Sequence, residues 1–157
     1  MRHSTFRLLI ALLLLLGPAA LRARAQAGEQ TYRGRLTWTG TVPVGLKGQK
    51  RLVPSFRGAA FDSEQQVGTL LVRLPGTVAA GQLTEAEYEP LLPAQAGQLD
   101  ITALPPSPLV QLVAGTEARQ PVTILRLQPL RRNPQTGQAE RLVRFAYTYG
   151  LGSNRPQ

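Results

Sequence analysis

The acidic residues are the first candidates for chemistry in this 157-residue chain. Glu85, Glu87 and Glu89 stand at every second position, so on an extended strand their carboxylates share one face. That face can be a carboxylate cluster that binds a metal or transfers protons, or it can be the solvated face of a strand. A hydrolase that uses carboxylates alone, Glu85, Glu87 and Asp100 among them, is the corresponding catalytic hypothesis.

Other catalytic arrangements lack the residues they need. The chain has no cysteine, and its single histidine is His3, near the N-terminus. A nucleophile needs a neighbouring base, so Ser/His/Asp and Cys/His sites are excluded once an N-terminal leader is removed. Metal sites with His or thiolate ligands are excluded for the same reason. We therefore expect no catalytic residue, no metal site and no cofactor in this chain alone.

The N-terminus has the three parts of a secretory signal peptide. Residues 2–7 carry basic side chains, residues 8–16 are apolar, and small residues allow cleavage after Ala25 or Ala27. The apolar run is shorter than the roughly 20 residues that span a bilayer. We expect a signal peptide at residues 1–27, no membrane span in the mature chain, and a location in the periplasm, on the outer membrane surface or outside the cell.

The charge of the mature chain argues against a nucleic-acid partner. The full chain has a formal net charge of +9, but four of its Lys and Arg residues and none of its acidic residues lie in the leader, which leaves +5. The basic residues are scattered singly, apart from Lys50-Arg51 and Arg131-Arg132. The chain carries no motif of the common nucleic-acid-binding modules.

The pattern of the mature chain predicts one all-β domain at residues 28–150. The chain contains 15 Gly and 13 Pro, and no segment keeps a 3.6-residue apolar period. We expect an antiparallel β-sandwich of about six to eight strands. Residues 151–157 contain Gly, Pro and Ser and are typical of a linker or of a truncated C-terminus.

The expected strands are short and separated by turn residues. Residues 31–39 predict a half-buried strand whose Trp38 anchors the core. Residues 40–48 predict a loop or an irregular edge. Residues 52–62 predict a bulged edge strand, and we expect its Phe56 and Phe61 to fill part of the core. Further strands are expected at residues 67–75, 77–92, 99–104 and 109–114, with a turn at Gly115-Thr116. Residues 82–89 could instead make a turn of helix, but Pro90 favours an extended chain before it.

Residues 120–149 predict a single long β-hairpin with arms at 121–130 and 140–149. Between the arms, Asn133 can bond its own backbone and Gly137 supplies a positive φ. The apolar residues at alternate positions of the second arm predict one buried face: Val143, Phe145, Tyr147 and Tyr149.

The turn of this hairpin carries the candidate partner-binding residues. Arg131, Arg132 and Asn133 lie beside it, where a charged tip on a rigid hairpin can reach into a partner's cleft. The alternative is an edge strand kept soluble by arginine. We expect replacement of Arg131 or Arg132 to weaken partner binding with little loss of stability.

Three pieces of the sequence together resemble a known family. They are LVPSFRGAAFD (residues 52–62), EYEPL (87–91) and QPLRRNPQTG (128–137), in this order behind a leader. They are similar to the N-terminal, gingipain-propeptide-like region of the type IX secretion system sortase, in the gingipain family of caspase-like cysteine peptidases. The resemblance implies an exported β-sandwich that precedes a cell-surface transpeptidase, which cleaves C-terminal sorting signals and attaches cargo to lipopolysaccharide.

The resemblance also implies a partner. The family's catalytic His and Cys lie downstream of this region, so no catalytic residue is carried over to this chain. In related peptidases such a region is a prodomain that assists folding and blocks the active site until it is cut away. The implied partner is a caspase-like peptidase domain, downstream or separate, with other type IX secretion components as further candidates. The rival hypothesis is a free-standing secreted β-sandwich that binds an envelope protein or a glycan.

Overall fold

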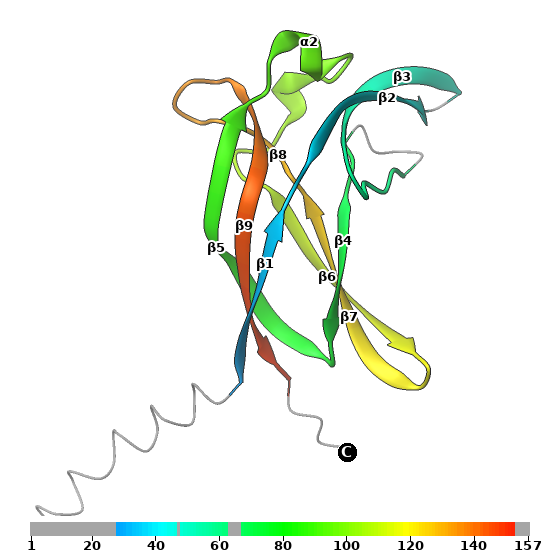
Figure 1. The fold of residues 1–157 in the computed structure, drawn as a ribbon, viewed down its shortest axis with the longest axis vertical. Helices are drawn as coiled ribbons and strands as arrows, with labels where there is room; N and C mark the ends of the chain where they lie inside the picture. Colours follow the sequence, from blue (N-terminus) through cyan, green and yellow to red (C-terminus); the bar gives the residue numbers. More distant parts are fainter. Residues whose placement is uncertain (1–27, 47, 63–66, 153–157) are drawn as a thin grey trace, which may run out of the picture.

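The computed structural model describes residues 28–46, 48–62 and 67–152, which form two packed antiparallel β-sheets and a hairpin (Figure 1). Nine strands are present in this part of the chain, where the sequence predicts six to eight. The predicted all-β fold is confirmed. The predicted signal peptide, residues 1–27, lies outside the described residues, as does most of the predicted linker, residues 153–157.

The first sheet is built around β9 (Ala139–Leu151). β5 (Val78–Pro90) pairs with β9 along nearly its whole length and forms one edge of the sheet. β1 (Glu29–Arg35) pairs with the later part of β9, and the short strand β8 (Leu130–Arg132) pairs with its first residues. The two strands therefore follow one another along the other edge.

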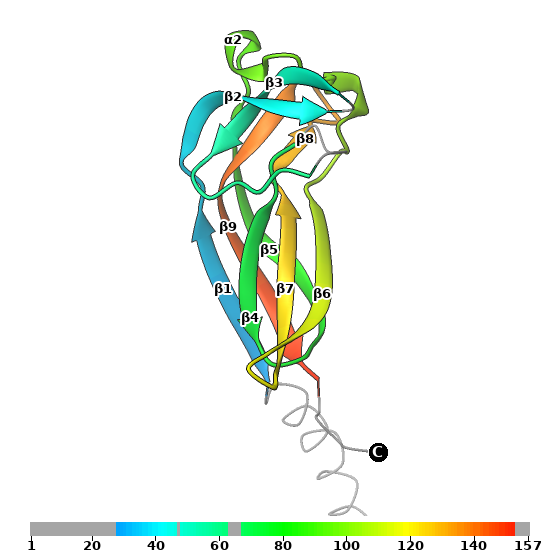
Figure 2. The same ribbon diagram turned by 90° about the vertical axis from the view of Figure 1, so that its right-hand side faces the viewer.

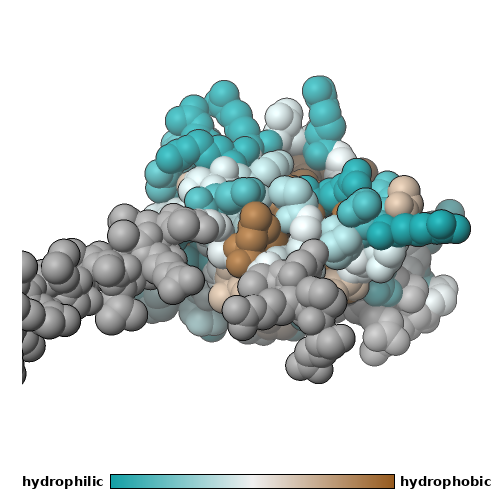
Figure 3. Space-filling model, turned by 90° about the horizontal axis from the view of Figure 1, so that it is seen from below, coloured by the Kyte–Doolittle hydropathy of each residue, from teal (hydrophilic) through white to brown (hydrophobic). Residues whose placement is uncertain are grey.

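The second sheet has β7 (Gln120–Gln128) in the middle, between β4 (Leu70–Pro75) and β6 (Leu109–Glu117). Figure 2 shows this sheet in front of the first. A separate hairpin of β2 (Trp38–Leu46) and β3 (Gln49–Phe56) lies across one end of the sandwich. The opposite end, seen from below in Figure 3, is mostly hydrophilic with small hydrophobic areas where grey atoms do not cover it.

Alternation along the strands places the core between the two sheets. Val72 and Leu74 on β4 are buried, as are Leu125 and Leu127 on β7, and all four belong to one cluster with Tyr147 of β9. The intervening residues of β4 are exposed. The predicted strand at residues 67–75 is therefore confirmed for residues 70–75, with Val72 and Leu74 facing inward.

The buried face predicted for residues 140–149 is correct for its aromatic residues. Phe145, Tyr147 and Tyr149 are buried in the core. Val143 is only half-buried, and Leu142 is fully buried instead. The pairing of β9 with β5 shifts by one residue at this point. Such a bulge adds one residue to the strand, so the side chains before it face the opposite way from the simple alternation.

The long hairpin predicted for residues 120–149 is wrong in its pairing. β7 pairs within the second sheet, and only β8 pairs with β9. Pro129 separates β7 from β8, and its carbonyl accepts a hydrogen bond from the Leu142 amide at 2.8 Å. Proline has no N–H to donate to a ladder, so the chain can leave one sheet here and enter the other.

The strand predicted for residues 31–39 is divided between two sheets. β1 ends at Arg35, and β2, which begins at Trp38, continues through residues that the sequence predicts as a loop. Gly40 lies at a register shift between β2 and β3 and has a φ of +97°. Such a bulge is a site where glycine is favoured, which explains why a glycine stands in this strand.

Phe56 is buried in the core, as predicted, whereas Trp38 is half-buried and packs against the core. Trp38 Nε1 donates to the Leu142 carbonyl at 2.9 Å, and the Trp38 and Phe56 rings meet edge to face with centroids 5.2 Å apart. Phe61 differs from the prediction, because it is only half-buried and lines a hollow at the surface.

Two further predictions of local structure are wrong. Residues 99–104 form no strand, because the Asp100 carboxylate accepts the Thr102 amide (3.0 Å) and begins a 3-10 helix, η1 (Ile101–Ala103), shortly after the short helix α2 (Pro93–Ala96).

Gly115 and Thr116 lie within β6 rather than in a turn. The chain turns at Ala118 and Arg119, whose φ values are +45° and +64°. Two-residue hairpin turns with positive φ usually contain Asn or Gly, so this pair gives no turn signal in the sequence.

Candidate functional site

The turn that joins β8 to β9 has the geometry that its sequence predicts. Asn133 Oδ1 accepts the amides of Gln135 (2.9 Å) and Thr136 (3.2 Å), and the Gly137 amide donates to the Asn133 carbonyl (2.8 Å). Gly137 has a φ of +70°. The turn is therefore held by the Asn133 side chain and by a left-handed glycine.

Arg131 lies against the sheet rather than at a free tip. Its Nε and Nη2 lie 2.7 and 2.6 Å from Glu140 Oε2, and its guanidinium carbon lies 3.5 Å from the centre of the Tyr88 ring. Its side chain is 23% exposed and that of Glu140 is 15% exposed. Arg131 thus joins three strands, β8, β9 and β5, through an ion pair and a cation–π contact.

Asn133 binds the same Glu140 carboxylate as Arg131. Its Nδ2 donates to Glu140 Oε1 at 2.7 Å, so both oxygens of this carboxylate are used. The pKa of Glu140 is held below its ordinary value chiefly by the Asn133 hydrogen bond, with Arg131 adding to the effect and burial opposing it. Burial raises the pKa of Tyr88, and Arg131 partly offsets that rise. We call Tyr88, Arg131, Asn133 and Glu140 the β8–β9 cluster.

Arg132 is the predicted site residue whose charge stays available. Its side chain is exposed, its Nε donates to the Gly137 carbonyl at 3.3 Å, and it has no acidic partner within the described residues. It lines a hollow of about 290 Å³ beside the turn. The walls of this hollow combine apolar, proline and polar side chains: Leu104, Pro106, Arg132, Asn133, Pro134 and Gly137.

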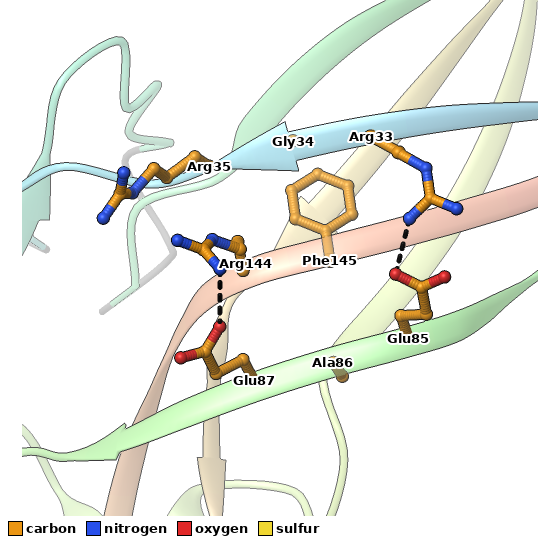
Figure 4. Close-up of a pocket in the computed structure, with 8 residues that line it drawn as sticks. All are labelled: Arg33, Gly34, Arg35, Glu85, Ala86, Glu87, Arg144 and Phe145. Atoms are coloured by element: carbon orange, nitrogen blue, oxygen red, sulfur yellow. Dashed lines mark hydrogen bonds and ion pairs between the residues drawn. The ribbon is translucent and has the colours of Figure 1, made fainter.

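The glutamates of β5 share one face, as predicted, and each meets an arginine. Glu85 pairs with Arg33 of β1, and the Glu87–Arg144 pair is longer, at 3.5 Å (Figure 4). Glu89 lies 2.7 Å from Arg141. Within the described residues no group of three His, Cys, Asp or Glu could hold a metal. In the described part of the chain, the three glutamates of β5 are therefore paired with arginines and do not form a metal-binding cluster.

Asp100 takes part in no such cluster. Its carboxylate is occupied by the amide and the hydroxyl of Thr102, at 3.0 and 2.6 Å. These bonds hold the pKa of Asp100 below its ordinary value. The carboxylate hydrolase hypothesis requires free carboxylates that face one another, and Glu85, Glu87 and Asp100 are each engaged in other contacts.

The sequence does not reveal two hollows on the sheet faces. One, of about 510 Å³, lies between the Arg33–Glu85 and Arg144–Glu87 pairs and includes Phe145 in its lining (Figure 4). The other, of about 550 Å³, lies on the second sheet and is lined in part by three apolar residues: Leu71, Val113 and Ile124. The only sequence signal for the second hollow is that β4, β6 and β7 each carry an apolar residue at an outward position.

No helix in the described part of the chain is long and apolar enough to cross a membrane.

Comparison with solved structures finds a chain of similar fold. The chain is similar to a chain of the complex of Porphyromonas gingivalis RgpB pro- and mature domains, with a TM-score of 0.55, 14% identity, and coverage of 84% of this chain and 83% of that one. The two chains share a fold. A structure that describes the zymogenic latency of gingipain K from the same organism aligns with a TM-score of 0.45 and 12% identity over 79% of this chain and 100% of that one.

Sequence comparison gives no relative. No family model matches the chain, and no curated protein matches it in sequence. The similarity to the RgpB complex confirms the gingipain-propeptide-like fold that the resemblance implies. It concerns the fold alone, because 14% identity does not carry residue roles from one chain to the other.

Proposed function

We propose that this chain is a non-catalytic, prodomain-like β-sandwich that packs against a caspase-like cysteine peptidase domain. The observation that carries the proposal is the shared fold with a chain of the complex of RgpB pro- and mature domains, over more than four fifths of both chains. The chain lacks cysteine, and its single histidine lies in the leader, so the nucleophile and base of such a peptidase must come from another domain.

The proposal includes the organisation of the chain. Residues 1–27 are a signal peptide, residues 28–151 the prodomain-like sandwich, which ends with β9, and the residues after Leu151 the start of a linker. The chain then acts in the periplasm, on the outer membrane surface or outside the cell. Its peptidase partner is of the type IX secretion sortase kind, and the sandwich chaperones or docks onto that partner.

Arg132 is the residue we assign to contact with the peptidase. The other two candidates, Arg131 and Asn133, already donate hydrogen bonds to the two carboxylate oxygens of Glu140. The exposed guanidinium of Arg132 and the hollow of about 290 Å³ beside it remain available. A rim arginine of this kind contributes to association rate and orientation more than to stability.

The first test is the coding sequence beyond Gln157, together with the genome that contains it. The proposal expects a caspase-like peptidase with a catalytic His and Cys in the same reading frame or elsewhere in that genome. A genome without any such peptidase would overturn the proposal.

The second test measures binding. Residues 28–157 and the peptidase domain, with its Cys replaced by Ala, are titrated by calorimetry. We expect a one-to-one complex with a Kd of about 1 µM or tighter, as for specific interfaces of standard size. Arg132→Ala should weaken binding about tenfold, a difference of about 1.4 kcal/mol.

The matched control for Arg132 is Arg119→Ala. Arg119 is also an exposed arginine, but it lies at the β6–β7 turn, at the opposite end of the sandwich (Figure 1). Equal weakening by both variants would show a general charge effect, and no binding by the unaltered chain would leave the free-standing binding module as the better hypothesis.

A further inference from the structure

Three of the four sheet edges of the sandwich, those formed by β1, β4 and β5, carry features that discourage pairing with another chain. β5 is interrupted by three register shifts against β9 and presents Glu85, Glu87 and Glu89. β1 is short and carries charged residues at Glu29, Arg33 and Arg35. Bulges, charges and short length are the usual means by which proteins protect the edge of a sheet.

β4 is protected in a similar way. It has six residues, carries Arg73, and ends at Pro75, which has no N–H to offer another strand. The edges formed by β1, β4 and β5 are therefore poor sites for strand addition.

β6 lacks these protective features. It runs for nine residues, Leu109–Glu117, in continuous register with β7 and without a bulge or a proline. Its one charged residue is Glu117, at its end, which pairs with Arg73 at 2.8 Å. Leu109 and Val113 are 46% and 43% exposed. Along its outer side, about every second residue leaves an N–H and a C=O unpaired.

We propose that β6 is an interaction strand, and that its partner is β6 of a second copy of this chain. The two strands pair antiparallel about a two-fold axis and join two three-stranded sheets into one of six strands. This inference rests on β6 itself and does not depend on the proposed peptidase partner.

The sequence of β6 is compatible with pairing to itself. Full overlap of the nine residues places Val113 opposite its own copy. Leu112 then lies opposite Ala114, and Leu109 opposite Glu117, so no two like charges meet. A two-fold interface needs a surface that is complementary to itself, and cross-strand pairs of β-branched residues are among the favourable ones.

The apolar surface beside β6 adds to the same interface. On the outer face of the second sheet, Val113 of β6 lies beside Ile124 of β7 as a cross-strand pair, and this pair brings apolar surface to the β6 edge. Leu71 lines the same hollow from β4, two strands away from that edge and outside the interface. In the dimer the two surfaces become continuous across the axis. A single strand pair buries less than a standard interface, so we expect a Kd on the order of 10 µM.

The experiment uses residues 28–157, which contain every described strand. Sedimentation velocity across a concentration series should show a monomer–dimer equilibrium. Val113→Lys should weaken dimerisation at least tenfold, because two lysines would then lie opposite each other. The matched control is Leu71→Lys, since Leu71 is 51% exposed on the same face but lies on β4, the other edge strand. We expect this control to dimerise like the unaltered chain.

Amide hydrogen exchange on the unaltered chain gives a readout that needs no variant. Outward amides of β6 should become protected as protein concentration rises, whereas those of β4 should not. A monomer at every concentration up to about 100 µM, well above the expected Kd, overturns the proposal. Equal loss in both lysine variants also overturns it, in favour of packing through the sheet face. A third result would also overturn the proposal: the unaltered chain is monomeric, and its Val113→Lys variant no longer binds the peptidase. In that case β6 binds the peptidase rather than a second copy.

Discussion

The guanidinium carbon of Arg131 lies 3.5 Å from the centre of the Tyr88 ring, while the same guanidinium is bound to Glu140. Tyr88 belongs to β5 and Glu140 to β9, so Arg131 of β8 is held by two strands of the first sheet. This arrangement changes the expectation that Arg131 and Arg132 act alike, because one is part of the packing and the other is exposed.

Replacement of Arg131 by Ala should lower the free energy of unfolding by about 2 kcal/mol. The variant loses the cation–π contact and leaves the poorly exposed Glu140 carboxylate without its ion partner. Urea denaturation at pH 7 measures the change. Arg132→Ala is the control and should cost less than about 0.5 kcal/mol, as is usual for exposed residues. Equal effects of the two substitutions would contradict the structural role of Arg131.

Acidification should weaken the fold through Glu140. Its pKa is lower in the folded chain than its ordinary value of 4.5. The folded state therefore binds fewer protons than the unfolded state in this range, so the contribution is complete above about pH 4.5 and is lost as the pH falls through the folded pKa. Glu140→Gln removes this contribution, and the free energy of unfolding should then depend less steeply on pH below 4.5.

Glu87→Gln is the control for the acid experiment. Glu87 meets Arg144 at 3.5 Å, and both side chains are about 60% exposed, with values of 61% and 59%. Pairs of this kind contribute at most about 1 kcal/mol. If Glu87→Gln changed the pH dependence as much as Glu140→Gln does, the assignment to Glu140 would be refuted.

Arg119→Gly should stabilise the chain by about 0.5–1 kcal/mol. Arg119 has a φ of +64°, which costs an L-residue about 1 kcal/mol or more and costs glycine little. The gain should appear as a higher denaturation midpoint with an unchanged m-value. Thr116→Gly, in neighbouring β6, should instead destabilise, since glycine weakens a strand. A destabilised Arg119→Gly would mean that the turn does not have this conformation in solution.

Gly34→Ala should destabilise the chain by about 1–3 kcal/mol. A Cβ at residue 34 would lie 2.5 Å from Phe145 Cζ, and the buried Phe145 ring has little room to move. Gly150→Ala is the matched control, because nothing lies within 4 Å of the added carbon. It should be neutral or slightly stabilising. Thermal melting followed by circular dichroism distinguishes the two variants, and similar melting temperatures would contradict the packing of Phe145 over Gly34.

The all-β fold, the extended course of β5 and the β8–β9 turn could be predicted because each depends on neighbouring residues. Alternation of side chains identifies β4 and β9, and the Asn133–Gly137 turn is defined by residue types within five positions. The division of residues 120–149 between two sheets could not be predicted in this way. β7 has the same alternation whichever sheet it joins, so its pattern does not identify its partner.

The candidate site shows the same limit. Arg131 and Arg132 are identical neighbours in the sequence, and what separates them is Tyr88, which reaches Arg131 from another strand. The glutamates of β5 were correctly placed on one face, but the arginines opposite them come from β1 and β9. Pairings between distant segments decide the role of each charged residue, and a local pattern does not contain them.

The central position of β9 affects the order in which the chain can fold. Glu29 pairs with Gly150, and β5 also depends on β9. A chain synthesised from its N-terminus can form the β2–β3 and β6–β7 hairpins early, but β1 and β5 stay without a neighbour until residues 139–151 have been made. The first sheet therefore assembles in a late step, in which the β1–β9 pairing closes a loop of more than a hundred residues, and folding dominated by such distant contacts is slow. Among the strands that the structure describes, the last to be synthesised is the one that completes the sandwich.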